Sequence, residues 1–206
     1  MGISFRSISF RKRGGGWARL VLLLSLVTLG SSGAGCVVAP PVSTKQILRQ
    51  QALLDFTGLL PARPLEQLNV KWAVPRGWES LPPKSGLMFT HQQYRSPSGV
   101  TGVGVAYVRL PFPVPSSTIA WIAQREYLKK HDDQREAKLL GRWSDNAGRE
   151  WFEGENNKYH GTGYVMTRGN EAWIVYSGWR VMFPPNPEEI SISKRSVQTI
   201  VPLPKD

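Results

Sequence analysis

Cysteine is almost absent from this chain, because Cys36 is the only one among 206 residues. A single thiol cannot close a disulfide within the chain, nor supply the cysteine sets of structural zinc sites. It also excludes a cysteine nucleophile at any other position. The fold must therefore be held together by packing and hydrogen bonds.

A long hydrophobic run is missing as well. The most apolar stretch is Leu20–Leu29, and ten residues rise only about 15 Å as a helix, half the thickness of a bilayer core. The stretch follows a segment, residues 1–19, that carries five basic and no acidic residues. A basic segment before a short apolar run is typical of a secretory signal peptide. We therefore predict that residues 1–35 form a cleavable signal peptide.

Small residues stand directly before Cys36, namely Gly33, Ala34 and Gly35. They resemble the lipobox of bacterial lipoproteins, although Gly33 stands where that family usually has leucine. The resemblance implies cleavage after Gly35, lipidation of Cys36 with acyl chains such as palmitate, and anchoring to a membrane. Several acyl chains together hold a protein firmly to a bilayer, whereas one holds it only marginally.

The lipobox resemblance also implies a location in the bacterial cell envelope. Val37 follows the cysteine, where lipoproteins kept in the inner membrane usually have aspartate. This favours the outer membrane, facing the periplasm. The alternative is a secreted or periplasmic protein, since Ser32-Gly33-Ala34 also fits the small-x-small rule of an ordinary signal-peptidase cut.

Positive charge is in excess, with a formal net charge of +11. Removal of residues 1–35 leaves 21 basic and 15 acidic residues, a net charge of +6. No basic run after the leader is longer than two residues, as in Lys194-Arg195. Nucleic-acid binding normally needs a denser basic patch, so we expect no nucleic acid as a partner.

The mature chain divides at a segment rich in glycine and proline, residues 57–64. Before it, residues 36–64 are predicted to be a lipidated tether with a short helix over residues 44–56. Ser43 and Gln46 have the spacing of a capping box at its start. After it, residues 65–206 are predicted to form one compact domain.

Alternating apolar and polar residues predict strands, and periodic apolar residues predict helices. The predicted fold class is α+β, with a central antiparallel sheet of about five to seven strands and helices packed on its faces. Ser116-Ser117 and Asn186 are predicted helix N-caps, and Gly169-Asn170 is a predicted hairpin turn. The main strands are expected over residues 86–95, 100–110, 137–143, 150–155, 159–168 and 172–181, and the main helices over residues 116–130 and from residue 187 on.

This order of elements resembles the PsbP-like superfamily. The resemblance rests on KWAVPRGW at residues 71–78, AWIVYSGW at 172–179 and EEISISKRSVQTI at 188–200. It implies an α/β/α sandwich, a central antiparallel sheet covered by helices on both faces. The best-known members bind other proteins, so the resemblance also implies a protein partner. It places no functional residue in this chain.

Catalytic motifs and cofactor motifs are both missing. No G-x-S-x-G accompanies the three histidines, His91, His131 and His160. Glu153, Glu155 and His160 are the only candidates for a metal or hydrolytic site, since they fall on two neighbouring predicted strands. His91 is expected at the surface, and His131 at the end of a helix. We therefore expect no catalytic residue, no metal and no cofactor.

Tryptophan is abundant, with eight in the chain. Seven fall on predicted strands or helices, and we expect at least five of these in the core. Trp143, Trp151 and Trp179 are the weak candidates for a binding patch. The sequence thus favours a non-enzymatic, membrane-tethered protein-binding or scaffold module. The alternatives are an envelope hydrolase that uses the Glu153, Glu155 and His160 region, and a carrier of a small lipid or cell-wall ligand.

Overall fold

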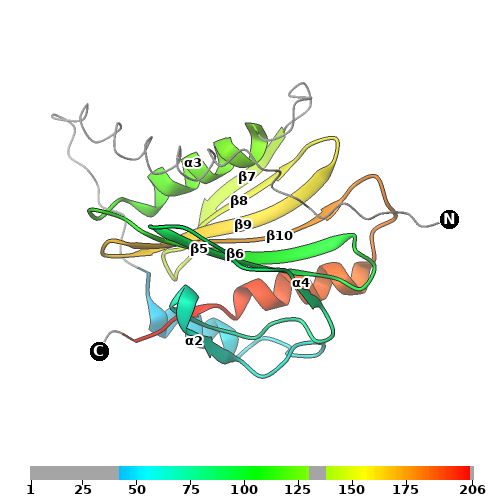
Figure 1. Cartoon of the computed structure of the whole chain (residues 1–206), viewed down its shortest axis with the longest axis horizontal. Helices are drawn as coiled ribbons and strands as arrows, with labels where there is room; N and C mark the ends of the chain where they lie inside the picture. Colours follow the sequence, from blue (N-terminus) through cyan, green and yellow to red (C-terminus); the bar gives the residue numbers. More distant parts are fainter. Residues whose placement is uncertain (1–41, 130–137, 205–206) are drawn as a thin grey trace. The chain divides into compact units, whose positions relative to one another are not determined.

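The computed structural model describes residues 42–129 and 138–204 (Figure 1). These residues belong to one compact unit, Val37–Asp206. The predicted signal peptide, the cleavage position Gly35, the lipidation site Cys36 and His131 lie outside the described residues.

A large antiparallel sheet forms the centre of this unit. Within the described residues it has eight strands in the order β3-β5-β6-β10-β9-β8-β7, with β4 also paired to β5. The predicted α+β class is confirmed, but the predicted five to seven strands were too few. The short β3 and β4 account for the difference, because two-residue strands carry no alternation that a sequence can reveal. The strands are β3 (Glu79–Ser80), β4 (Lys84–Ser85), β5 (Phe89–Arg95), β6 (Thr101–Arg109), β7 (Lys138–Ser144), β8 (Glu150–Glu155), β9 (Tyr159–Arg168) and β10 (Glu171–Arg180).

A second, small sheet was not predicted. It joins β1 (Arg63–Leu65), β2 (Val70–Trp72) and β11 (Val201–Pro202), with β2 in the middle. A single 3₁₀ turn, Glu66–Leu68, links the first two strands and ends at Asn69, whose φ of 52° is left-handed. Asparagine tolerates this conformation better than most residues. The small sheet thereby brings the two ends of the domain together.

Helices cover both faces of the large sheet (Figure 1). On one face lies α3 (Ser116–Lys129), which packs on β8 and β9. On the other face lies α4 (Pro187–Gln198), which packs on β10 and β6. We call these faces the α3 side and the α4 side. None of the helices in the described residues is long and apolar enough to cross a membrane.

The first helix, α2 (Thr44–Gln51), docks on the domain through Ile47, which is fully buried. The hydroxyl of Ser43 accepts a hydrogen bond from the Gln46 N–H, as the capping spelling predicted. The helix ends at Gln51 and not at residue 56. Residues 42–51 thus contribute to the core together with the compact domain.

The main core lies on the α4 side of the sheet. Trp72 and Trp173 are fully buried there, and each indole N–H donates to a backbone carbonyl, of Ser196 and Leu68 respectively. Four of the seven tryptophans are buried, one fewer than expected: Trp72, Trp78, Trp151 and Trp173. Trp121 and Trp143 are instead nearly half exposed.

His91 does not lie at the surface as predicted, because it is only 3% exposed. Its Nε2 hydrogen-bonds the hydroxyl of Tyr176, and the two rings stack on the α3 side. Gly104 makes this possible, since a Cβ there would lie 2.3 Å from that hydroxyl. The glycine in this strand thus makes room for a tyrosine side chain.

Candidate functional site

Strand pairing brings Glu153, Glu155 and His160 together on the α4 side. Glu155 lies directly opposite His160 in the β8–β9 pair, and Glu153 is two residues along β8 on the same face. His160 Nε2 is 2.9 Å from Glu153 Oε1, and its Nδ1 is 3.4 Å from Glu155 Oε2. The sequence therefore identified a true cluster, and the hairpin between β8 and β9 assembles it.

The neighbouring strand and helix complete this cluster. Trp179 lies opposite His160 in the β9–β10 pair, and their rings stack with centroids 4.3 Å apart. Lys194 of α4 places its Nζ 5.8 Å from the centroid of the Trp179 ring. The imidazole is thus fixed by an aromatic ring and by two carboxylates.

This geometry does not suit acid–base catalysis. A histidine acting as a general base needs a nitrogen that is available to accept a proton. Both ring nitrogens of His160 already face a carboxylate oxygen, at 2.9 Å for Nε2 and 3.4 Å for Nδ1. The hydroxyl of Thr162, two residues from His160 on β9, donates to the Phe152 carbonyl at 3.3 Å. The arrangement is that of a closed polar cluster.

The same three residues were also the predicted candidates for a metal site. Across residues 42–129 and 138–204, no group of three or more histidine, cysteine or carboxylate side chains is placed to hold a metal ion. Glu153 and Glu155 direct oxygens toward the imidazole of His160, where they hydrogen-bond it from two sides.

The second candidate region holds Trp143 and Trp151, which pair across β7 and β8. Their rings are nearly parallel, at 3°, with centroids 5.9 Å apart. Trp151 is 9% exposed and packs on Tyr164, whereas Trp143 is 45% exposed. Trp143 is therefore the member of the pair that a partner can reach.

A buried ion pair fixes the inner tryptophan. Asp145 accepts hydrogen bonds from Trp151 Nε1 at 2.8 Å and from Arg149 Nε at 2.6 Å. Burial raises the pKa of Asp145, but the bond from Trp151 and the charge of Arg149 outweigh it and hold the pKa below its usual value. Arg149 also lies over the ring of Tyr164 and donates a hydrogen bond to Gln50 of α2. Burial raises the pKa of the Tyr164 hydroxyl well above its usual value.

The three predicted patch residues do not form one patch. Trp143 lies on β7 and Trp179 on β10, three strand spacings or about 14 Å away across the sheet. Along the strands they differ by about four residues, since Trp143 is level with Val175. Trp143 therefore belongs to the edge of the sheet, and Trp179 to the polar cluster around His160.

The edge carries exposed residues that the sequence analysis missed. Leu139 and Leu140 on β7 are each 47% exposed, and so is Trp121 on α3. Only the strand order reveals that β7 has no strand on its outer side among the described residues.

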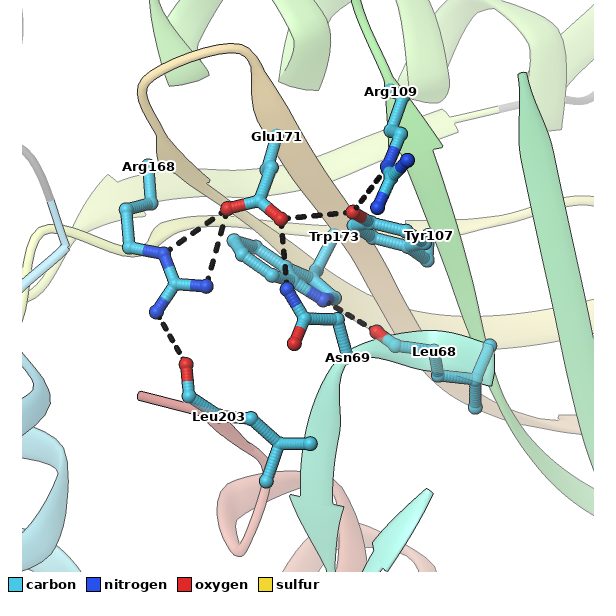
Figure 2. A network of polar contacts seen from close by, with 8 residues as sticks. All are labelled: Leu68, Asn69, Tyr107, Arg109, Arg168, Glu171, Trp173 and Leu203. Atoms are coloured by element: carbon cyan, nitrogen blue, oxygen red, sulfur yellow. Dashed lines mark hydrogen bonds and ion pairs between the residues drawn. The ribbon is translucent and has the colours of Figure 1, made fainter. Parts of the chain in front are cut away.

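A second polar network lies at the opposite end of β10 and was also missed (Figure 2). The buried carboxylate of Glu171 accepts hydrogen bonds from Asn69 at 2.7 Å, Tyr107 at 2.8 Å and Arg168 at 3.1 and 3.2 Å. Arg168 also donates to the Leu203 carbonyl and lies over the Trp173 ring. The network fastens the small sheet and the end of the chain to the large sheet.

Local electrostatics agree with a structural role for this network. Burial raises the pKa of Tyr107; the bond from Arg109 opposes that shift, and the bond to Glu171 adds to it. The Tyr107 hydroxyl therefore stays protonated and donates to Glu171 while it accepts from Arg109 at 3.1 Å. The same bond raises the pKa of Arg109. These donors and acceptors are used within the protein, which leaves the network closed.

No model of a known protein family matches this chain, and no curated protein matches its sequence. The PsbP-like and lipobox resemblances therefore stay predictions. The exposed apolar residues of the β7 edge, among them Trp143, Leu139 and Leu140, form a surface that a partner can reach.

Proposed function

We propose that this chain is a lipid-tethered protein of the bacterial cell envelope whose PsbP-like domain binds another protein without catalysing a reaction. The proposal includes cleavage after Gly35, lipid on Cys36, and attachment to the outer membrane on its periplasmic side. The basic segment, the short apolar run and the small residues before Cys36 support the tether.

One observation carries the binding role: the β7 edge exposes apolar side chains on both faces of the sheet. Trp143, Leu139 and Leu140 come from the strand and Trp121 from the adjoining helix. Tryptophans at the surface are enriched at protein interfaces, where they supply much of the binding energy. The closed cluster around His160 supports a non-enzymatic role, since neither ring nitrogen is open to a substrate.

The tether is tested by the intact mass and detergent partitioning of the chain from membranes of its native host. We expect a chain that starts at Cys36 with the mass of added lipid, and loss of both mass gain and detergent partitioning in Cys36→Ala. An unmodified, water-soluble chain in both versions would overturn the tether.

The binding role is tested in the same membranes with a photo-crosslinking residue in place of Leu140. The matched control replaces Leu87, a fully exposed leucine between β4 and β5, toward the opposite edge of the sheet. We expect one discrete crosslinked species from position 140 and none from position 87. Equal crosslinking at both positions, or none at either, would contradict a partner at the β7 edge.

A further inference from the structure

Among the described residues, no strand pairs with the outer side of β7. Six of its seven residues are exposed and Gly141 is partly exposed, whereas the other long strands are largely buried. In the described part of the chain, β8 is its only paired neighbour (Figure 1). The opposite edge is different, since it ends in the two-residue β3.

The backbone of β7 offers hydrogen-bonding groups on its outer side. The Asp145 N–H donates to the Arg149 carbonyl at 3.0 Å, so Asp145 faces β8. Antiparallel pairs alternate between residues that bond inward and residues that point outward. Trp143 therefore bonds toward β8, while Arg142 and Ser144 direct their N–H and C=O groups away from the sheet.

Apolar side chains flank these outward groups on both sides of the sheet. Trp143 lies on the α4 side, as its stacking on Trp151 shows. On the α3 side, Arg142 donates to the Ser117 carbonyl of α3, which places that face of the helix beside β7. Trp121 is one helical turn beyond Ser117, on the same face. An added strand would thus have tryptophan on either side.

The residues of β7 itself carry positive charge, while the carboxylates of β8 lie one strand further in, with Glu155 directly opposite Lys138. Strand β7 contributes Lys138 and Arg142 and contains no carboxylate, and Arg125 of α3 lies over the exposed Trp121 ring. Arg142 has a distant partner in Glu150, at 3.9 Å. Carboxylates on an incoming segment would therefore be attracted to this edge.

The outward backbone groups and the charge of β7 distinguish between three possible binding partners of this edge: a lipid surface, a second copy of the chain and an extended acidic segment. A lipid surface would leave the outward N–H and C=O groups of β7 without hydrogen-bonding partners, which is costly in a nonpolar medium. The β7 strand of a second copy would supply no carboxylate for Lys138 and Arg142. An extended acidic segment satisfies both the backbone groups and the charge.

We propose that β7 accepts an extended segment of a partner protein, with apolar and acidic residues in alternation, as an added antiparallel strand. This inference rests on the proposed function and names its mode of binding. The bulge at Leu140, where the register with β8 shifts, and the edge cations limit indiscriminate pairing. The added strand is accordingly short and centred on residues 142–144.

The test uses the full-length chain in detergent and a fluorescent eight-residue peptide that alternates valine and glutamate. Its binding is measured by anisotropy, beside a peptide that alternates valine and lysine. Ser144→Pro removes one outward N–H and no charge, and proline is tolerated on an edge strand at such a position. Ser144→Ala is the matched control that keeps the N–H.

We expect the glutamate peptide to bind at least tenfold more tightly than the lysine peptide. Ser144→Pro should weaken its binding about fivefold, the worth of one hydrogen bond of about 1 kcal/mol, and Ser144→Ala should leave it within twofold. Arg142→Glu, within residues 142–144, should weaken binding of the glutamate peptide and strengthen binding of the lysine peptide. This charge reversal keeps the proposal testable if Ser144→Pro does not fold.

Several outcomes would overturn strand addition. The first two are equal peptide binding by folded Ser144→Pro and Ser144→Ala, and no binding of the glutamate peptide to the parent. A dimer that Ser144→Pro dissolves would indicate a second copy at the edge. Binding of Cys36→Ala to phosphatidylglycerol vesicles that Leu140→Ser abolishes would indicate a lipid surface. If position 140 crosslinks a partner in membranes while these peptide results fail, the proposed binding role stands and only the strand mechanism is wrong.

Discussion

Arg149 and Asp145 form a nearly buried ion pair, with Arg149 Nε 2.6 Å from Asp145 Oδ2 and the guanidinium side chain 5% exposed. Asp145 also accepts from Trp151, while Arg149 reaches Gln50 and covers Tyr164. The pair thus connects α2, the turn between β7 and β8, and the tryptophan that supports Trp143. Loss of the Asp145 charge would leave the buried guanidinium of Arg149 without its anionic partner.

We therefore predict that Asp145→Asn lowers the free energy of unfolding by about 3 kcal/mol at pH 7. The pKa of Asp145 is lowered in the folded protein, so its contribution is complete above the ordinary value of 3.8 and is lost as the pH falls through the folded value. Urea unfolding of both proteins at pH 7 and pH 3 measures this. The gap should shrink at pH 3, and a gap that is constant with pH would contradict the linkage.

The Glu171 network predicts a second stability effect. Glu171→Gln removes the negative charge that faces Arg168. Its amide NH₂ would also point at a group that donates a hydrogen bond to Glu171 in the parent. We therefore expect the free energy of unfolding, measured in chemical denaturant, to fall by about 2–3 kcal/mol. Glu79→Gln is the matched control, because the Glu79 side chain is 57% exposed in its pair with Arg95. That change should cost less than about 1 kcal/mol. Equal effects would show that the network adds nothing to stability.

The cap of α4 can be tested with two substitutions at one position. Asn186 Oδ1 accepts from the N–H groups of Glu188 at 3.0 Å and Glu189 at 3.3 Å. Asn186→Ala should lower the free energy of unfolding by about 1 kcal/mol, whereas Asn186→Asp keeps the acceptor and should be close to neutral. Thermal unfolding followed by circular dichroism is sufficient. A destabilisation of the same size in both variants would argue against the cap.

Tryptophans in the core and at the edge should respond differently to the same change. Trp173→Phe removes the hydrogen bond to Leu68 and leaves a cavity among fully buried residues, so we expect a loss of about 2–3 kcal/mol. Trp143→Phe changes a side chain that is 45% exposed and should cost less than about 1 kcal/mol. Urea unfolding at one pH compares them, and a reversed order would mean that Trp143 belongs to the core.

Features that depend on neighbouring residues could be predicted from the sequence. The strands Glu150–Glu155 and Tyr159–Arg168 have the predicted bounds, and β10 differs by one residue at each end. The Asn186 cap was also correct. Such features follow from backbone geometry and side-chain periodicity within a few residues, which a sequence displays directly.

The cluster of Glu153, Glu155 and His160 could be predicted from the sequence only in part. The predicted hairpin brought the right residues side by side, but their use depends on Trp179, which arrives from the next strand. The sequence could name the group and could not tell that both ring nitrogens are engaged.

What only the tertiary structure decided is the position of each strand in the sheet and the contacts across it. His91 is buried because Tyr176 reaches it from 85 residues away, and Glu171 binds Asn69 from 102 residues away. The apolar residues of β7 are exposed because that strand lies at an edge. The sequence by itself determined the local elements, whereas the signal peptide before Cys36 stays a prediction. Alternation shows which side chains share a face, but pairing between distant strands determines whether anything covers that face.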